Sequence, residues 1–215
     1  MKIAIIVCAA VAAAAVCSIV GCRMFSKRST DATIPLTAKL PGKAAVVFYS
    51  QSKVRNTATV AQWIAKHTGA ALFELEMVEP YPEPYFTTIK ATYKDFKAGT
   101  LPALKEIPNL DGYDVVFLGA PIWYGTYAMP VGTFLKANPL AGKTVAPFCS
   151  HGGGGAGHFA DDIQKACPAA KVLEPLVIRG SNQVERRMGF GVSAHHTEDD
   201  VVEWLNRLDS SWKAP

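Results

Sequence analysis

The chain has little charge, and the charge that it has is not clustered. Its 215 residues include 22 Lys and Arg against 18 Asp and Glu, a formal net charge of +4. Because the basic residues are scattered and do not stand beside stacking aromatics, no nucleic-acid partner is predicted. A hydrophobic content of 49% with 19% charged residues is typical of a globular chain that can bury one core.

Cysteine is also scarce. Of the five cysteines, only Cys149 and Cys167 come after the first 22 residues. Cys149 is expected to end a strand and Cys167 to end the next helix, so they should lie at opposite ends of the layer. A helix of roughly ten residues rises about 15 Å, which exceeds the reach of a disulfide. We therefore predict two buried free thiols, and we predict no metal site.

The first 22 residues differ in composition from the rest. Met1-Lys2 is a short basic start, and a nearly continuous apolar run then closes with Ile19-Val20-Gly21-Cys22. This segment resembles a bacterial lipoprotein signal, in which the last cysteine, here Cys22, is lipidated and becomes the mature N-terminus. An uncleaved inner-membrane anchor remains open, because Ile3–Gly21 is about long enough to span a bilayer. Either interpretation predicts a membrane-tethered protein, and the first predicts a lipoprotein on the extracytoplasmic, periplasmic side of a bacterium.

Residues 23–42 are polar, are interrupted by Pro35 and Pro41, and have no helical or strand period. They are predicted to be a linker that holds the C-terminal domain off the membrane. Positive charges at the start of this segment disfavour simple export of that domain, which keeps the anchor hypothesis open.

Residues 43–215 have the alternating pattern of one α/β domain. Apolar runs at 44–49, 72–78, 114–118, 144–149 and 172–178 predict buried strands, and helical spacing predicts helices over 60–67, 85–97, 131–137, 159–166 and 198–208. Five strands alternating with five helices predict a doubly wound parallel sheet with helices on both faces. Only Arg179–His196 lacks a period, and it is predicted to be a functional lid or a mobile loop.

The strand at 114–118 leads into Pro121, Ile122, Trp123, Tyr124 and Gly125. Ligands of open α/β sheets bind beyond the carboxyl ends of strands. Adjacent aromatics at a strand end cannot both face the same core, so at least one should point into the crevice, where it can stack on a flat ring.

The loop after the first strand, Ser50–Thr57, opens a helix with hydroxyl and amide side chains. Together with unpaired backbone N–H groups they can form a phosphate cradle, to which Lys53 or Arg55 could add charge. The alternative is that Ser, Asn and Thr only cap the helix. Gly-x-Gly-x-x-Gly and Walker lysine patterns are absent from this loop, so it gives no support for a dinucleotide or nucleoside triphosphate site.

The loop after the fourth strand, Ser150–Gly157, contains five glycines in eight residues. So many glycines are costly in backbone entropy, and they are explained if the main chain approaches a ligand closely. His151 is interpreted either as a hydrogen-bonding loop residue or as a group that transfers a proton.

These loops together resemble those of the flavodoxin-like FMN-binding proteins, which include flavodoxins and NAD(P)H-quinone reductases. The motifs that carry the resemblance are Pro121-Ile122-Trp123-Tyr124-Gly125 and Pro147-Phe148-Cys149-Ser150-His151-Gly152-Gly153, and the similarity runs from about residue 43 to residue 208. The resemblance implies a flavodoxin-like doubly wound five-stranded parallel sheet of order 2-1-3-4-5, and noncovalently bound FMN.

The resemblance also implies site residues. It assigns the phosphate to Ser50, Ser52, Asn56 and Thr57, one flavin wall to Pro121, Ile122, Trp123, Tyr124 and Gly125, and the pyrimidine side to Ser150, His151, Gly152, Gly153 and Gly154. The phosphate loop departs from the family pattern because Lys53-Val54-Arg55 replaces a single glycine. Two outcomes are therefore open: reduced FMN affinity, or compensation by Arg55 at the phosphate.

The leading hypothesis is a membrane-tethered FMN-binding redox protein that passes electrons to a redox partner protein or a small electron acceptor. One alternative is an NAD(P)H-dependent quinone or FMN reductase. Another is a flavodoxin-fold binding module that has lost its cofactor.

Overall fold

The computed structural model describes residues 33–83, 85–180 and 196–212. Its central sheet has the order β2-β1-β3-β5-β6, with β7 also paired to β5, and all of these pairings are parallel. In chain order these strands are β1 (Ala44–Phe48), β2 (Ala71–Glu74), β3 (Val115–Trp123), β5 (Thr144–His151), β6 (Lys171–Val172) and β7 (Leu176–Arg179). The predicted doubly wound parallel sheet of order 2-1-3-4-5 is confirmed, with β6 and β7 together in the place of the fifth strand.

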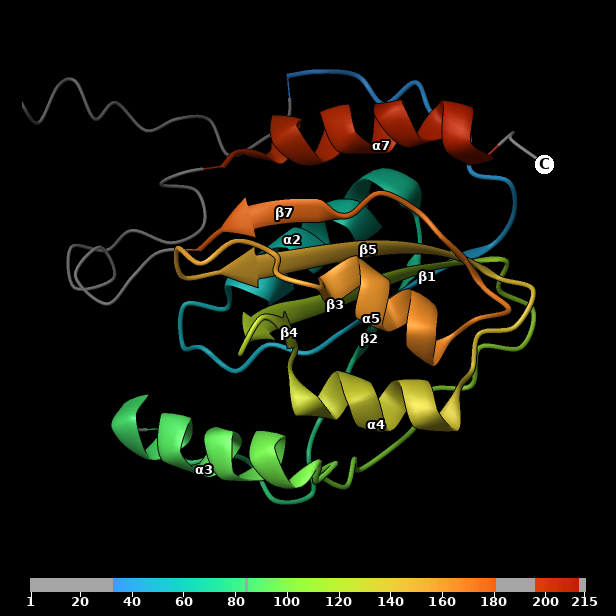
Figure 1. Cartoon of the computed structure of the whole chain (residues 1–215). Coiled ribbons are helices and arrows are strands. Elements are labelled where there is room, and N and C mark those ends of the chain that lie inside the picture. The colour runs from blue at the N-terminus through green and yellow to red at the C-terminus, as the bar shows by residue number, and fades with distance from the viewer. Residues whose placement is uncertain (1–32, 84, 181–195, 213–215) are drawn as a thin grey trace, which may run out of the picture. The chain divides into compact units, whose positions relative to one another are not determined.

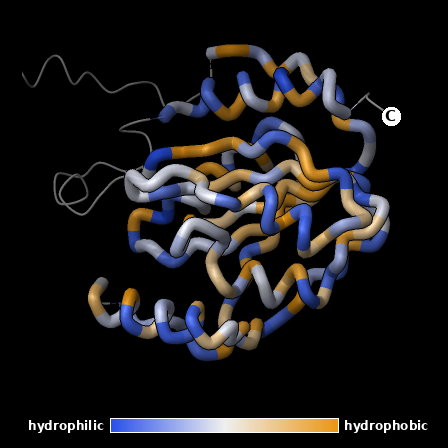
Figure 2. Tube along the Cα trace, in the orientation of Figure 1, coloured by the Kyte–Doolittle hydropathy of each residue, from blue (hydrophilic) through white to orange (hydrophobic). Residues whose placement is uncertain are grey.

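Helices cover both faces of this sheet (Figure 1). They are α2 (Asn56–Thr68), α3 (Tyr85–Ala98), α4 (Met129–Ala137), α5 (Phe159–Ala166) and α7 (Glu198–Trp212). One buried cluster joins the sheet to α4 and α5, and a second joins the opposite face to α2 and α7. Figure 2 shows the hydrophobic strands gathered between these layers.

Two strand predictions need correction. The predicted strand 172–178 is broken into β6 and β7, and Pro175, which has no N–H to donate to a ladder, lies in the break. The predicted strand 72–78 ends as β2 at Glu74. Beyond it the backbone pairs with a different segment, because Val78 N donates to Ala103 O at 2.9 Å and Lys105 N donates to Glu76 O at 2.8 Å.

The described part of the predicted linker lies along α7. Backbone N–H groups of Thr33, Thr37 and Lys39 donate to the side chains of Asp199, Asn206 and Asp209 at 2.6, 2.8 and 3.1 Å. Leu36 and Leu40 pack against the core beneath. Residues 33–40 therefore form part of the domain surface.

Helix α7 begins at a polar junction with α2. The Glu198 carboxylate, which is almost fully buried, lies 2.6 Å from His67 Nε2 and 3.0 Å from Lys66 Nζ. The first turn of α7 is capped, because Thr197 N donates to Asp200 Oδ2 at 2.5 Å. These contacts fix the N-terminus of α7 against the last turn of α2.

Cys149 and Cys167 are free and buried, as predicted, and burial raises the pKa of the Cys149 thiol to about 12. Among the residues that the structure describes, no helix is long and apolar enough to cross a membrane. The signal or anchor predicted at 1–22 and most of the loop predicted at 179–196 lie outside the described residues.

Candidate functional site

The loops after β1, β3 and β5 meet at the carboxyl edge of the sheet. Thr57 Oγ1 and Ser150 Oγ, from the first and third loops, lie 2.8 Å apart in a buried hydrogen bond. The second and third loops also meet, because His158 N donates to Gly125 O at 2.7 Å. A Cβ atom on Gly157 would lie 2.1 Å from Gly125 O, so this approach requires a glycine.

The N-terminus of α2 has no side-chain cap. Its N-cap residue, Arg55, has φ 59° and ψ 36° in the left-handed region and makes no capping hydrogen bond. The alternative in which Ser, Asn and Thr cap this helix is therefore wrong for the N-cap position. Among the described residues, the backbone N–H groups of Asn56–Ala58 make no hydrogen bond, as expected for the first turn of a helix.

A buried polar cluster surrounds this uncapped terminus. Ser50, Asn56, Thr57 and Ser150 are all buried, whereas Ser52 is exposed. Asn56 Oδ1 is buried without a hydrogen-bond partner among the described residues. Rotating a carboxamide exchanges its donor and acceptor, so Asn56 can present either to a ligand. A buried polar atom without a partner is costly, and it marks this position as a place for a polar ligand.

The two cations of the loop are engaged elsewhere. Arg55 Nη2 lies 2.5 Å from Glu74 Oε2, and Arg55 Nη1 donates to Ser50 O at 3.2 Å. The hydrogen bond with Glu74 is the main reason that the pKa of Arg55 is raised. Lys53 Nζ lies 2.5 Å from Glu83 Oε2. Both side chains therefore pair with carboxylates, and Arg55 contacts the buried polar cluster only at the Ser50 carbonyl oxygen.

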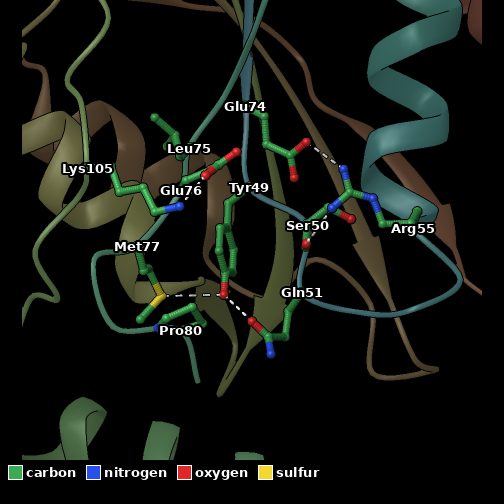
Figure 3. Close-up of a pocket in the computed structure, with 10 residues that line it drawn as sticks. All are labelled: Tyr49, Ser50, Gln51, Arg55, Glu74, Leu75, Glu76, Met77, Pro80 and Lys105. Carbon is green, nitrogen blue, oxygen red and sulfur yellow. Dashed lines mark hydrogen bonds and ion pairs between the residues drawn. The ribbon is translucent and has the colours of Figure 1, made fainter. Parts of the chain in front are cut away.

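An open cavity of about 340 Å³ lies beside this loop (Figure 3). It is lined by Tyr49, Ser50, Gln51, Arg55, Glu74, Leu75, Glu76, Met77, Pro80 and Lys105. Its charges are matched in pairs, since Lys105 Nζ lies 2.7 Å from Glu76 Oε2 and Arg55 is bound to Glu74. The Tyr49 hydroxyl contacts Gln51 and Met77, and burial raises its pKa.

Sequence reasoning did not identify this cavity. Ser50 and Arg55 in its lining are predicted site residues, but Glu74, Glu76 and Lys105 are distant from that loop in sequence, so no local pattern groups them with it.

The second loop, predicted to follow the strand from Pro121 to Gly125, is part of a β-hairpin. β3 continues through Pro121 and Ile122 to Trp123 and pairs antiparallel with β4 (Thr126–Tyr127). The two turn residues, Tyr124 and Gly125, have φ values of 53° and 82°. Positive φ at both positions is what a two-residue type I′ hairpin requires. Pro121 and Ile122 are partly buried in this strand.

Trp123 and Tyr124 point to different neighbours. The Trp123 ring is partly buried and makes edge contacts with Tyr49 and Tyr81, with centroids 5.8 and 5.6 Å apart. Tyr124 is 38% exposed, and its ring centroid lies 5.5 Å from that of Tyr93 in α3. The Tyr124 hydroxyl also donates to Ile89 O at 3.0 Å. The hairpin turn is therefore supported by α3.

The third loop is organised by its histidine. His151 Nδ1 accepts hydrogen bonds from Gly153 N at 3.0 Å and Gly155 N at 3.1 Å. The accepting Nδ1 carries no proton, so the neutral ring carries its proton on Nε2. Burial, with a smaller effect of Arg179, lowers the pKa of His151 and favours this neutral form. Gly152, Gly153 and Gly154 are exposed. In the described region the Gly154 N–H has no hydrogen-bond partner.

The family model for flavodoxins matches residues 43–207. The chain belongs to the flavodoxin family. No curated protein matches the chain. The flavodoxin match covers the whole sheet and all three loops of the carboxyl edge.

Solved structures of flavoproteins have the same fold. A candidate flavoprotein of Bacteroides eggerthii is 24% identical with a TM-score of 0.63, over 77% of this chain and 97% of that one. A flavoprotein of Lactobacillus acidophilus, solved in complex with FMN, is 20% identical with a TM-score of 0.55, over 68% of this chain and 97% of that one. At these identities the likeness establishes the fold.

Proposed function

We propose that this flavodoxin-family chain binds FMN noncovalently at the carboxyl edge of its sheet and acts as a membrane-tethered electron-transfer protein. Family membership supports FMN as the cofactor. The observation that carries the proposal is the buried cluster of Asn56, Thr57 and Ser150 at the uncapped N-terminus of α2. This arrangement suits the phosphate of FMN, because backbone N–H groups and the helix dipole favour an anion there.

The first loop would hold the phosphate by hydrogen bonds from protein groups. The N–H groups of the first turn of α2 supply donors, and Thr57 and Ser150 supply hydroxyls that already lie 2.8 Å apart. The amide of Asn56 supplies a further donor when it is rotated. The long loop Ser50–Arg55 is held in place by the Arg55 contacts with Ser50 and Glu74.

The second and third loops would orient the ring system. FMN, when bound, supplies electron-transfer chemistry. Trp123 and the hairpin turn supply an aromatic wall, and the glycine loop brings its backbone close from the other side. His151 in its neutral form keeps a proton on Nε2, which makes that atom a hydrogen-bond donor at the edge of the loop. Together these groups would position the ring.

The first test is the absorption spectrum of the purified full chain, followed by titration with FMN. We expect flavin bands, or saturable binding of added FMN with weaker binding of riboflavin, which lacks the phosphate. A chain that shows neither the bands nor any change on adding FMN is a cofactor-less binding module. Steady oxidation of NADPH in the presence of a quinone would assign the chain to the reductases. If the bound FMN is reduced only by a partner reductase, the result supports a role as an electron carrier.

We propose that residues 1–22 tether the protein to a membrane as a lipoprotein signal, with Cys22 as the lipidated residue. Cys22→Ser is expected to abolish incorporation of labelled fatty acid and to misprocess or release the protein. If the Cys22→Ser protein remains in the membrane fraction as before, the segment is an uncleaved anchor.

A further inference from the structure

Helix α3 carries exposed apolar side chains that the proposed cofactor site does not use. Phe86 is 84% exposed, Tyr93 is 50% exposed and Ile89 is 39% exposed. Residues three and four apart in a helix share one side, so Phe86, Ile89 and Tyr93 form one stripe. Figure 2 shows hydrophobic and hydrophilic segments alternating along this helix. Large exposed apolar groups gathered on one helix mark an interaction surface.

Positive charge adjoins this stripe. Lys90, Lys94 and Lys97 are exposed and recur at helical spacing on the neighbouring side of α3. The only acidic residue of α3, Asp95, accepts a hydrogen bond from the Tyr81 hydroxyl at 2.7 Å. Within the described parts of the chain, none of these three lysines forms an ion pair. The surface of α3 is therefore apolar and basic at once.

We propose that this surface of α3 docks on a bilayer that contains anionic phospholipid headgroups. A helix with exposed aromatic and aliphatic groups beside lysines has the chemistry of an interfacial membrane helix. The apolar side chains enter the headgroup boundary while the lysines pair with lipid phosphates. The inference rests on the membrane tether proposed for residues 1–22.

Because the proposed tether at residues 1–22 already holds the domain near the bilayer, a weak attraction between α3 and lipid is sufficient for docking. Three lysines and three partly exposed apolar residues would hold a free protein only loosely, because a short amphipathic contact buries little area. A domain that is already attached near the surface meets the lipid at a high effective concentration, so the same contact becomes favourable. Docking of α3 would then fix the orientation of an otherwise freely tumbling domain.

Docking would also bring the candidate cofactor edge to the membrane. Tyr124, at the tip of the β3–β4 hairpin, contacts α3 through the Tyr93 ring and through its hydroxyl bond to Ile89 O. The aromatic wall and the docking helix are thus one connected surface. This placement favours a membrane-bound electron donor or acceptor over one that diffuses in the aqueous phase.

The test is hydrogen exchange of α3 in the full chain after reconstitution into vesicles. One set of vesicles contains only phosphatidylcholine, and the other also contains phosphatidylglycerol. We expect the peptide spanning 85–98 to exchange about tenfold more slowly on the anionic vesicles, consistent with the attraction of several lysines to an anionic surface. The combined variant K90Q/K94Q/K97Q should lose that difference.

A charge-matched control is K39Q/K136Q/K171Q, which removes the same charge from other elements and should retain the protection. Equal exchange of α3 on both vesicles, with the chain still recovered in the vesicle pellet, overturns the docking proposal but leaves the tether. Recovery of the chain in the supernatant overturns the tether and the docking together. Protection that requires an added protein, and that neither vesicle produces, assigns the surface to a protein partner and overturns the proposal.

Discussion

The guanidinium of Arg55 lies 2.5 Å from the carboxylate of Glu74 and also donates to the Ser50 carbonyl oxygen at 3.2 Å. These contacts connect the N-cap of α2 to β2 and fix the end of the lengthened loop that joins β1 to α2. They hold a residue whose φ of 59° favours glycine. A non-glycine residue in that region costs roughly 1–2 kcal/mol, so the side-chain contacts offset a backbone cost.

Arg55→Gly is expected to change FMN affinity by less than about threefold, because the guanidinium is engaged with Glu74 and an exposed ion pair contributes only about 0–1 kcal/mol. Glycine also relieves the positive φ, so the free energy of unfolding should change by no more than about 1 kcal/mol. FMN titration and urea unfolding measure the two effects. Arg55→Ala, which keeps the unfavourable backbone without the ion pair, should be the less stable variant. A tenfold loss of FMN affinity with unchanged riboflavin affinity would instead place Arg55 on the phosphate.

Thr57→Val removes a hydroxyl from the buried pair with Ser150 at the N-terminus of α2. A hydrogen bond to a charged group contributes about 1.5–3 kcal/mol, so FMN affinity should fall about tenfold or more while riboflavin affinity stays constant. Parallel titrations with the two flavins make the comparison. Thr133→Val is a matched control, because the Thr133 hydroxyl donates to Pro102 O away from the three loops. Equal losses for FMN and riboflavin would show a general disturbance of the site.

Trp123→Ala should weaken FMN binding by about 1 kcal/mol or more, roughly fivefold, because an aromatic wall is lost. It should also lower the free energy of unfolding, because Trp123 makes edge contacts with Tyr49 and Tyr81. Trp123→Phe retains an aromatic face and should restore most of the FMN affinity and most of the free energy of unfolding. FMN titration measures the first quantity, and urea unfolding measures the second. Reduced stability with unchanged FMN affinity would place Trp123 in the core alone.

The sheet order and its two covered faces could be predicted because buried parallel strands produce continuous apolar runs. The hairpin could not, since its turn is Tyr124-Gly125 and lacks the Asn-Gly or Asp-Gly signal of a type I′ turn. Likewise no local pattern indicates that Arg55 adopts a left-handed conformation. Its partner Glu74 is brought beside the loop only by the folded sheet.

Contacts between segments that are distant in sequence explain the other differences between the predictions and the structure. Thr33 binds Asp199 across 166 positions of sequence, so the segment before β1 was predicted only as a linker. The glycines of the third loop predict a close backbone approach to a ligand, and this stays a prediction; the approach seen within the chain is that of Gly157 to the Gly125 carbonyl oxygen. They did not indicate that His151 accepts two of the loop's own N–H groups, because that depends on how the loop curls.

The stability of the domain should depend on the protonation of His151. Burial, and then Arg179, lowers the pKa of His151 in the folded chain below its ordinary value of 6.5. Above about pH 6.5 His151 is neutral in both the folded and the unfolded chain, so its protonation does not reduce the free energy of unfolding. As the pH falls below about 6.5 the unfolded chain takes up the proton first, so the free energy of unfolding decreases. Protonation of Nδ1 in the folded chain would also remove the acceptor for Gly153 and Gly155.

His151→Asn is the variant that isolates this effect, because its carboxamide oxygen can accept hydrogen bonds near the position of Nδ1 and does not titrate in this range. Urea unfolding at about pH 7.5 and about pH 5.5 should show that wild type loses more stability on acidification than His151→Asn does. His67 and His196 are present in both proteins, so their contributions cancel in the difference. Parallel pH dependences for the two proteins would show that protonation of His151 is not linked to folding, and the Nδ1 contacts would then not order the loop.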